Sequence, residues 1–164
     1  MKLDVGCGNF PTGDVNCDMY IKDVGHRTGK IDKRTSPLAP SNIKNFVLCD
    51  VQHLPFRESI FEEVYSSHVI EHVKDPYRLF REMLRTSNSK VVIFCPHRFG
   101  DRLQGHNPYH IHFLNKAWFF KAARKFNVFI DIVYSNYVHI PFEFLSLFRL
   151  PLEMKIKIQK KVQV

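Results

Sequence analysis

The sequence predicts an α/β fold in which helices pack on a seven-stranded, mostly parallel sheet. Short runs rich in β-branched and aromatic residues alternate along the chain with segments of helical periodicity. The 164 residues, 45% of them hydrophobic and 24% charged, suit one globular domain spanning residues 1–164. In the last run, Glu153–Lys160, apolar residues alternate with lysines, which predicts an antiparallel edge strand with one exposed face.

Six further runs have the length and composition of strands and are bounded by glycine, proline or polar residues. The seven expected strands are Met1–Val5, Asp14–Asp18, Asn45–Cys49, Glu63–Ser67, Lys90–Cys95, Val128–Tyr134 and Glu153–Lys160. We expect the first five to be mostly parallel and to lie in the middle of the sheet.

Two segments predict helices between these strands. Asp75 and Pro76 are a capping residue followed by proline at the first helical position, and apolar residues recur at helical spacing after them. A second helix is expected over Asn115–Lys125. Residues 19–44 are polar, basic and broken by glycine and proline, which predicts a mobile loop with a short helical turn near Pro40–Ile43.

Charge and cysteine content narrow the class of protein. With 24 Lys and Arg against 16 Asp and Glu, the net charge of +8 favours anionic partners such as phosphate esters or nucleic acid, although no RNA-binding motif is visible. No charged leader and no apolar run of membrane-spanning length is found, so we expect a cytoplasmic protein without a membrane span. The cysteines lack metal-ligand spacing and are interpreted as reduced, buried residues: Cys7, Cys17, Cys49 and Cys95.

The first expected strand ends in a glycine turn, Gly6-Cys7-Gly8. Glycine permits positive φ and a close approach of the backbone to a ligand. A dinucleotide fits badly, because the G-x-G-x-x-G pattern would need glycine where the chain has Pro11, and because the second strand follows too soon for a phosphate-binding helix. A tight turn without a ligand is the alternative interpretation.

Acidic residues close the next two expected strands. Asp18 can accept both hydroxyls of a ribose, and Asp50 can accept from the exocyclic amine of adenine, with Val51 and Leu54 on either side of the ring. Each aspartate taken alone could equally be a helix cap or a turn residue. Together with the glycine turn, the two acids favour a nucleoside site.

Four segments, in this order, resemble the motifs of class I S-adenosylmethionine-dependent methyltransferases. They are Leu3–Gly8, Cys49–Phe56 with its D-x-x-x-L-P-F signature, Phe61–Val73 with its I-E-H signature, and the fifth strand before Pro96. The resemblance covers about residues 1–125. It implies a Rossmann-like three-layer sandwich, S-adenosyl-L-methionine as the methyl donor, and S-adenosyl-L-homocysteine as the product.

The resemblance also implies cofactor-binding roles. The turn beneath the methionine moiety would comprise Asp4, Gly6, Cys7 and Gly8. Asp18 would hold the ribose, Asp50 with Val51 would frame the adenine, and Ser67 with His68 would lie beside the sulfonium. Phe10 replaces the family's third glycine, and the first crossover is shortened to residues 9–13. We also expect the chain to lack the lid that many relatives fold over the cofactor. We therefore expect an open pocket, or one completed by residues 19–44 or by a second subunit.

Methyl transfer needs mainly alignment and exclusion of water, and a general base only where the acceptor must lose a proton. His68 and His97 are the candidate bases by position, whereas Glu71 and His72 are interpreted as structural. Basic side chains after the fifth strand suit an anionic, small-molecule acceptor: Arg98, Arg102, His106 and His110. We predict no metal, because Pro108 interrupts the helix that a paired-histidine zinc site would need.

Tyr137–Leu152 is an aromatic, apolar insertion between the last two strands, expected to be a core-covering loop or short helix. The alternatives are a protein contact, such as a homodimer interface, or a wall for a lipophilic substrate. The predicted function is methyl transfer from S-adenosyl-L-methionine to an unidentified acceptor. Two alternatives stay open: a catalytically degenerate relative that binds the cofactor or a partner, and a basic RNA-binding accessory domain.

Overall fold

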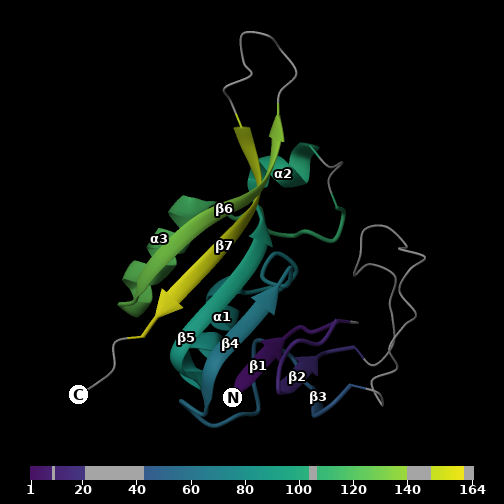
Figure 1. Cartoon of the computed structure of the whole chain (residues 1–164), viewed down its shortest axis with the longest axis vertical. Coiled ribbons are helices and arrows are strands. Elements are labelled where there is room, and N and C mark those ends of the chain that lie inside the picture. Colours follow the sequence, from purple (N-terminus) through teal and green to yellow (C-terminus); the bar gives the residue numbers. More distant parts are fainter. Residues whose placement is uncertain (9, 21–42, 104–106, 140–148, 161–164) are drawn as a thin grey trace.

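The structure of the chain, a computed structural model, describes residues 1–8, 10–20, 43–103, 107–139 and 149–160. Its seven-stranded sheet has the order β3-β2-β1-β4-β5-β7-β6 (Figure 1). The strands are β1 (Lys2–Val5), β2 (Val15–Asp18), β3 (Phe46–Leu48), β4 (Phe61–Ser67), β5 (Ser87–Pro96), β6 (Phe129–His139) and β7 (Arg149–Gln159). The helices are α1 (Pro76–Thr86), α2 (Arg98–Leu103) and α3 (Lys116–Phe126). Strands β1 to β5 pair in parallel, so the predicted α/β class is confirmed.

The last strand requires one correction. β7 is antiparallel, as predicted, but it pairs with both β5 and β6, and the edge strand is therefore β6. The predicted alternation is present, since Met154, Ile156 and Ile158 are fully buried while Lys157 is exposed. Such alternation reports that one face of a strand is exposed; it does not report whether the strand has one neighbour or two.

Other segments extend or complete the predicted elements. The short helix α2 follows β5 where no helix was predicted. Tyr137–His139 and Arg149–Leu152 continue β6 and β7 as a paired hairpin, so the flanks of the expected insertion are strand rather than loop or helix. Residues 140–148, and most of the predicted loop 19–44, lie outside the described residues.

The hydrophobic core lies between the sheet and helices α1 and α3. Asp75 caps α1 through the Arg78 amide, and Asn115 caps α3 through the Trp118 amide. The buried apolar residues of the two helices pack with those of the strands in one hydrophobic cluster. The larger members of this core are Leu79, Phe80, Met83, Phe119, Ile93, Met154, Ile156 and Ile158. All four cysteines are free thiols, with Cys7, Cys17 and Cys95 buried and Cys49 half-buried.

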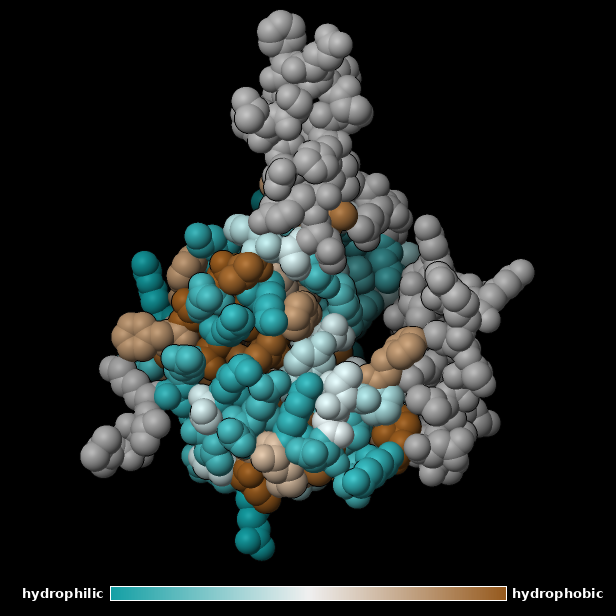
Figure 2. Space-filling model, viewed as in Figure 1, coloured by the Kyte–Doolittle hydropathy of each residue, from teal (hydrophilic) through white to brown (hydrophobic). Residues whose placement is uncertain are grey.

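The other face of β1, β4 and β5 carries charged side chains. Lys90 Nζ lies 2.6 Å from Glu63 Oε2, and Lys2 Nζ lies 3.9 Å from Glu63 Oε1. Figure 2 shows one side of the molecule, on which hydrophilic residues predominate around scattered apolar ones. Partly exposed ion pairs of this kind add little stability.

The connection between β1 and β2 is unusually short for two parallel neighbours. Only residues 6–14 join them, whereas a parallel crossover usually takes a dozen residues or more. The described residues of this connection form no helix, and side chains hold it instead. Asp4 Oδ2 accepts from Thr12 N at 2.8 Å and from Thr12 Oγ1 at 2.9 Å. Asn16 exchanges two hydrogen bonds with the Gly13 backbone, which fixes the entry into β2.

The D-x-x-x-L-P-F segment is anchored by an ion pair on α1. Glu82 Oε2 accepts from the Leu54 amide at 3.0 Å and from Arg85 Nη2 at 2.7 Å. Arg85 in turn donates to the carbonyls of Leu54 and Phe56 at 2.9 and 2.8 Å. Glu82 is only 7% exposed, so the pair satisfies polar groups that water reaches poorly.

We expect Glu82→Ala to lower the free energy of unfolding by about 2 kcal/mol, because the Leu54 amide and the Arg85 guanidinium both lose a charged partner. Urea denaturation at neutral pH measures the change. Arg81→Ala is the matched control, since Arg81 is exposed on the same helix. A loss no larger than that of the control would contradict the anchoring role.

The anchor also predicts a pH dependence. Arg85 lowers the pKa of Glu82 below its ordinary value of 4.5, so the stabilisation is present above that value and is lost as pH falls through the lowered pKa. The stability difference between the wild type and Glu82→Gln should therefore shrink as pH is lowered into the acid range. Denaturation at a series of pH values tests this, and a difference that does not change with pH would speak against it.

Candidate functional site

The carboxyl ends of β1, β2 and β3 meet where the strand order reverses. From β1 the chain moves outward to β2 and β3, and it then returns to place β4 on the other side of β1. Open α/β sheets bind ligands at such a switch point, beyond the carboxyl ends of the strands. The predicted glycine turn and the two predicted acids all lie at this edge.

The glycine turn follows β1 directly. Gly6 and Gly8 have φ values of +72° and +54°, in the left-handed region that favours glycine. A Cβ on Gly6 would lie 2.3 Å from a methyl group of Val69, so the backbone there packs against the segment after β4. A Cβ on Gly8 would have no described atom within 4 Å. The turn is therefore tightly packed at Gly6 and open at Gly8.

Asp18 connects β2 to this turn. Its Oδ2 accepts from Gly8 N at 2.9 Å, and its Oδ1 accepts from Tyr20 N at 3.0 Å. Asp18 is only 8% exposed, and each carboxylate oxygen can accept more than one hydrogen bond. The carboxylate is thus oriented beside the open position at Gly8.

Asp4 lies beneath the turn. It is 2% exposed and bonded to Thr12, as described above. Burial raises the pKa of the Asp4 carboxyl, and the bonds from Thr12 offset part of that shift. These contacts give Asp4 a role in holding the connection that follows the glycine turn.

Asp50 and the residues after it form a different environment. The Asp50 carboxylate accepts from Gln52 N at 2.8 Å and contacts His53 Nδ1 at 3.3 Å. Burial opposes the charged form, but the bonds from Gln52 and His53 outweigh it and lower the pKa of Asp50. Its side chain is still 39% exposed, whereas Val51 and Leu54 are buried in the core at 6% and 4% exposure. Of the three residues expected around an adenine, only Asp50 has a side chain with substantial solvent-exposed surface that a ligand could contact.

His68 follows β4 in a strained backbone conformation. Its φ of +54° is rare for a residue with a side chain and is typical of functional sites. His68 Nε2 lies 2.8 Å from Glu153 Oε1, and Nδ1 lies 3.5 Å from Glu71 Oε1. Burial opposes protonation, but the two carboxylates outweigh it and raise the pKa of His68. A raised pKa favours the imidazolium, which is paired with these two carboxylates and is poorly suited to accept a proton as a general base.

His97, the other predicted base, is packed inside the structure. Its ring contacts Phe99 and Tyr134 at centroid distances of 5.2 and 5.7 Å, and Nδ1 accepts from Phe99 N at the start of α2. Burial lowers the pKa of His97, and the neighbouring Arg98 lowers it further. These contacts describe a capping residue for α2, a role that the sequence analysis did not consider.

The remaining predicted site residues are spread along the same edge. Ser67 is half-buried at the end of β4, where its backbone pairs with Phe94 of β5. Arg98 is half-buried and Arg102 exposed on α2, while His106 lies outside the described residues. Cys7 is 7% exposed within the glycine turn.

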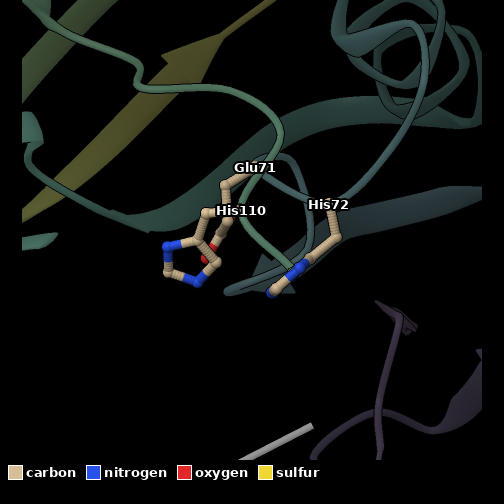
Figure 3. A group of neighbouring side chains, drawn as sticks. All are labelled: Glu71, His72 and His110. Atoms are coloured by element: carbon tan, nitrogen blue, oxygen red, sulfur yellow. The ribbon is translucent and has the colours of Figure 1, made fainter. Parts of the chain in front are cut away.

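His110 belongs to a group that the sequence analysis did not assemble. Glu71, His72 and His110 come together from two chain segments (Figure 3), and their ligand atoms all lie within 4.8 Å of one another. Glu71 and His72 were interpreted as structural, and His110 was grouped with Arg98, Arg102 and His106 as a contact of the acceptor. The contact joins residues 38 positions apart, which only the tertiary fold could reveal.

A hollow at the opposite end of the sheet does not belong to this site. It is lined by Met1, Lys2, Glu63 and Lys90, which lie at the amino ends of β1, β4 and β5. Ligands of open α/β sheets bind at the carboxyl ends instead. Among the described residues, no helix is both long and apolar enough to cross a membrane.

Comparison with known proteins identifies the family. Residues 3–95 match the family described as "Methyltransferase domain", whereas a search of curated proteins found no matching sequence. The family match covers more than half of the chain and includes β1 to β4, most of β5 and the glycine turn.

Solved structures of methyltransferases share the fold. An S-adenosylmethionine-dependent methyltransferase from Thermotoga maritima is 14% identical with a TM-score of 0.68, over 98% of this chain and 82% of that one. One from Archaeoglobus fulgidus is 14% identical with a TM-score of 0.64, over 97% and 85%. The plantazolicin methyltransferase BpumL, solved with a triazolic desmethyl analogue of plantazolicin and S-adenosylhomocysteine, is 17% identical with a TM-score of 0.62, over 97% and 76%.

The fold, the glycine turn at the switch point and the family match together define the class. The chain belongs to the methyltransferase domain family, which confirms its resemblance to class I S-adenosylmethionine-dependent methyltransferases. S-adenosyl-L-methionine is accordingly its cofactor, and the open position above Gly8 beside Asp18 fits a nucleoside-containing ligand.

Proposed function

We propose that this chain transfers a methyl group from S-adenosyl-L-methionine to an anionic small-molecule acceptor bound beyond the carboxyl ends of β4 and β5. One observation carries the cofactor part of the proposal. The buried Asp18 carboxylate is hydrogen-bonded to Gly8, and Gly8 faces space that no described atom fills. In doubly wound α/β folds, a carboxylate near the glycine turn accepts a hydrogen bond from a ribose hydroxyl.

Each residue at this edge has a distinct part in cofactor binding. Asp18, whose carboxylate accepts from the amides of Gly8 and Tyr20, holds the ribose hydroxyls. Gly8 allows the backbone to approach the methionine moiety closely. Asp50, with its partly exposed carboxylate, accepts from the adenine amine. Val51 and Leu54 support this segment from within the core.

The cofactor supplies a methyl group bonded to a positively charged sulfur. An electron pair of the acceptor forms the new bond to the methyl carbon while the carbon–sulfur bond breaks. The two electrons of the broken bond remain on sulfur, which becomes neutral. The protein therefore contributes chiefly alignment. Ser67 ends β4 and His68 follows it, on the other side of the switch point from β2. We assign these two residues to the region of the sulfonium.

Two arginines favour an anionic acceptor. Arg98 is half-buried and Arg102 is exposed on α2, which follows β5 at the same edge, whereas the charge of His68 is paired with Glu71 and Glu153. A cationic lining attracts anions and orients them. His97 has no part in this proposal as a base, because its ring is enclosed by Phe99 and Tyr134.

We expect Asp18→Asn to weaken binding of S-adenosylhomocysteine by about 5- to 150-fold, the equivalent of about 1 to 3 kcal/mol for a lost charged hydrogen bond. Isothermal titration calorimetry measures the affinity. Glu62→Gln is the matched control, because Glu62 lies at the amino end of β4, and its side chain is 77% exposed. Equal affinities of the wild type and Asp18→Asn would remove the ribose assignment.

We expect Gly8→Ala to fold with a loss of only about 1 kcal/mol, because its Cβ meets no described atom and the cost is limited to the positive φ. Its affinity for S-adenosylhomocysteine should nevertheless fall at least about tenfold, since the methyl group would occupy the ligand's space. Calorimetry and thermal unfolding on the same sample separate the two effects. An alanine variant that binds as well as the wild type would show that the cofactor does not contact this turn.

A further inference from the structure

The cluster of Glu71, His72 and His110 has the composition of a catalytic metal centre. We propose that it binds one divalent transition metal, with zinc the best match, and that the metal takes an anionic oxygen of the methyl acceptor at its open position. The metal site stands on the geometry alone, whereas the role of the acceptor rests on the proposed methyl transfer. Three observations support the site.

The first observation concerns the Glu71 carboxylate. Glu71 is 2% exposed, and neither of its carboxylate oxygens accepts a hydrogen bond from any residue that the structure describes. The nearest cationic group is His68, with its Nδ1 3.5 Å from Oε1. His68 supplies a charge partner, but a buried carboxylate whose oxygens accept no hydrogen bond from the described residues is still costly. A divalent cation on the side of the two histidines would bind this carboxylate directly.

The second observation concerns the tautomers of the two histidines. His72 Nδ1 lies 2.9 Å from the Tyr109 carbonyl, which can only accept, so the proton is on Nδ1 and the lone pair is on Nε2. His110 Nδ1 is hydrogen-bonded to the Asp101 carboxylate, which also accepts, so the proton of His110 is likewise on Nδ1. Metal-binding histidines usually donate their second nitrogen to a carbonyl or carboxylate in this way. Both imidazoles are therefore prepared to bind a metal through Nε2.

The third observation is that the two segments are held together independently of any metal. The amides of Ile111 and His112 both donate to the Glu71 carbonyl, at 3.0 and 3.1 Å. Asp101, 6% exposed on α2, holds His110 from the other side. The backbone thus places His110 beside Glu71 and His72, so a metal would not have to order a loose segment.

The spacing suits a small ion. Tetrahedral zinc with bonds of about 2.0 to 2.2 Å places its ligand atoms about 3.3 Å apart. The three ligand atoms lie within 4.8 Å of one another. Side-chain rotations that move each of these atoms by about 1 Å would bring them to the spacing of a zinc site. The His110 side chain is only 11% exposed, whereas His72 is half-buried, so solvent reaches the cluster chiefly from the side of His72.

The ligand set favours zinc over harder cations. Two imidazoles and one carboxylate suit zinc and neighbouring transition metals, whereas magnesium and calcium prefer oxygen ligands alone. Three protein ligands with an open fourth position are the pattern of catalytic rather than structural zinc. The charge of the metal would lower the pKa of a bound hydroxyl. The acceptor would then lose its proton to solvent before its oxygen forms the bond to the methyl carbon.

Cobalt(II) titration of chelator-treated protein tests the site without any turnover. Tetrahedral cobalt has intense visible absorption bands, so CoCl2 should give a spectrum that saturates at one ion per chain and is displaced by ZnCl2. His110→Ala and Glu71→Gln should each weaken binding by more than the about 10- to 100-fold typical of a lost outer-shell partner, and Asp101→Asn should weaken it within that range. His112→Ala is the matched control: this nearby imidazole contacts the Lys74 carbonyl instead.

Equal binding of cobalt by the wild type and His110→Ala, or no binding by the wild type, would overturn the proposal. Because the wild-type titration needs no substitution, a variant that fails to fold cannot leave the question open. Calorimetry with S-adenosylhomocysteine on the metal-free samples separates the two proposals. Cofactor binding without metal binding would reject only the metal site, and metal binding without cofactor binding would reject only the proposed methyl transfer.

Discussion

The candidate cofactor site depends on the hydrogen bond from Gly8 N to the Asp18 carboxylate, which spans 2.9 Å. This bond connects the end of β2 to the turn after β1, and it fixes the turn in a left-handed conformation that only glycine adopts easily. The same carboxylate then faces the open position above Gly8. One interaction therefore sets both the shape of the backbone and the position of the acid that would hold a ribose.

The short first crossover shows how this edge is built without the usual helix. Asp4 and Asn16, both 2% exposed, bond to Thr12 and Gly13 and take over the role of a crossover helix in holding the strands in parallel. Buried polar side chains with satisfied partners specify one conformation of a short connection. The price is a raised pKa at Asp4, which keeps this group from acting as an ordinary surface acid.

Local patterns in the sequence predicted the glycine turn, the acids at the strand ends and the caps of α1 and α3, because each depends on residues close in the chain. The position of β7 between β5 and β6 could not be predicted this way, since strand order depends on contacts between distant segments. The same reason applies to the group formed by Glu71, His72 and His110. His97 illustrates a further difficulty: a histidine after a strand is compatible with a base and with a helix cap, and the structure shows its contact with the first turn of α2.

Nuclear magnetic resonance of the 15N-labelled chain, recorded with and without S-adenosylhomocysteine, tests the central claim most directly. The account predicts that the Gly8 amide resonance shifts most strongly, together with the amides that follow β2 and β3 at the switch point. Ligand-induced shifts confined to Lys2, Glu63 and Lys90 at the amino ends of the strands, with an unchanged Gly8 resonance, would contradict it.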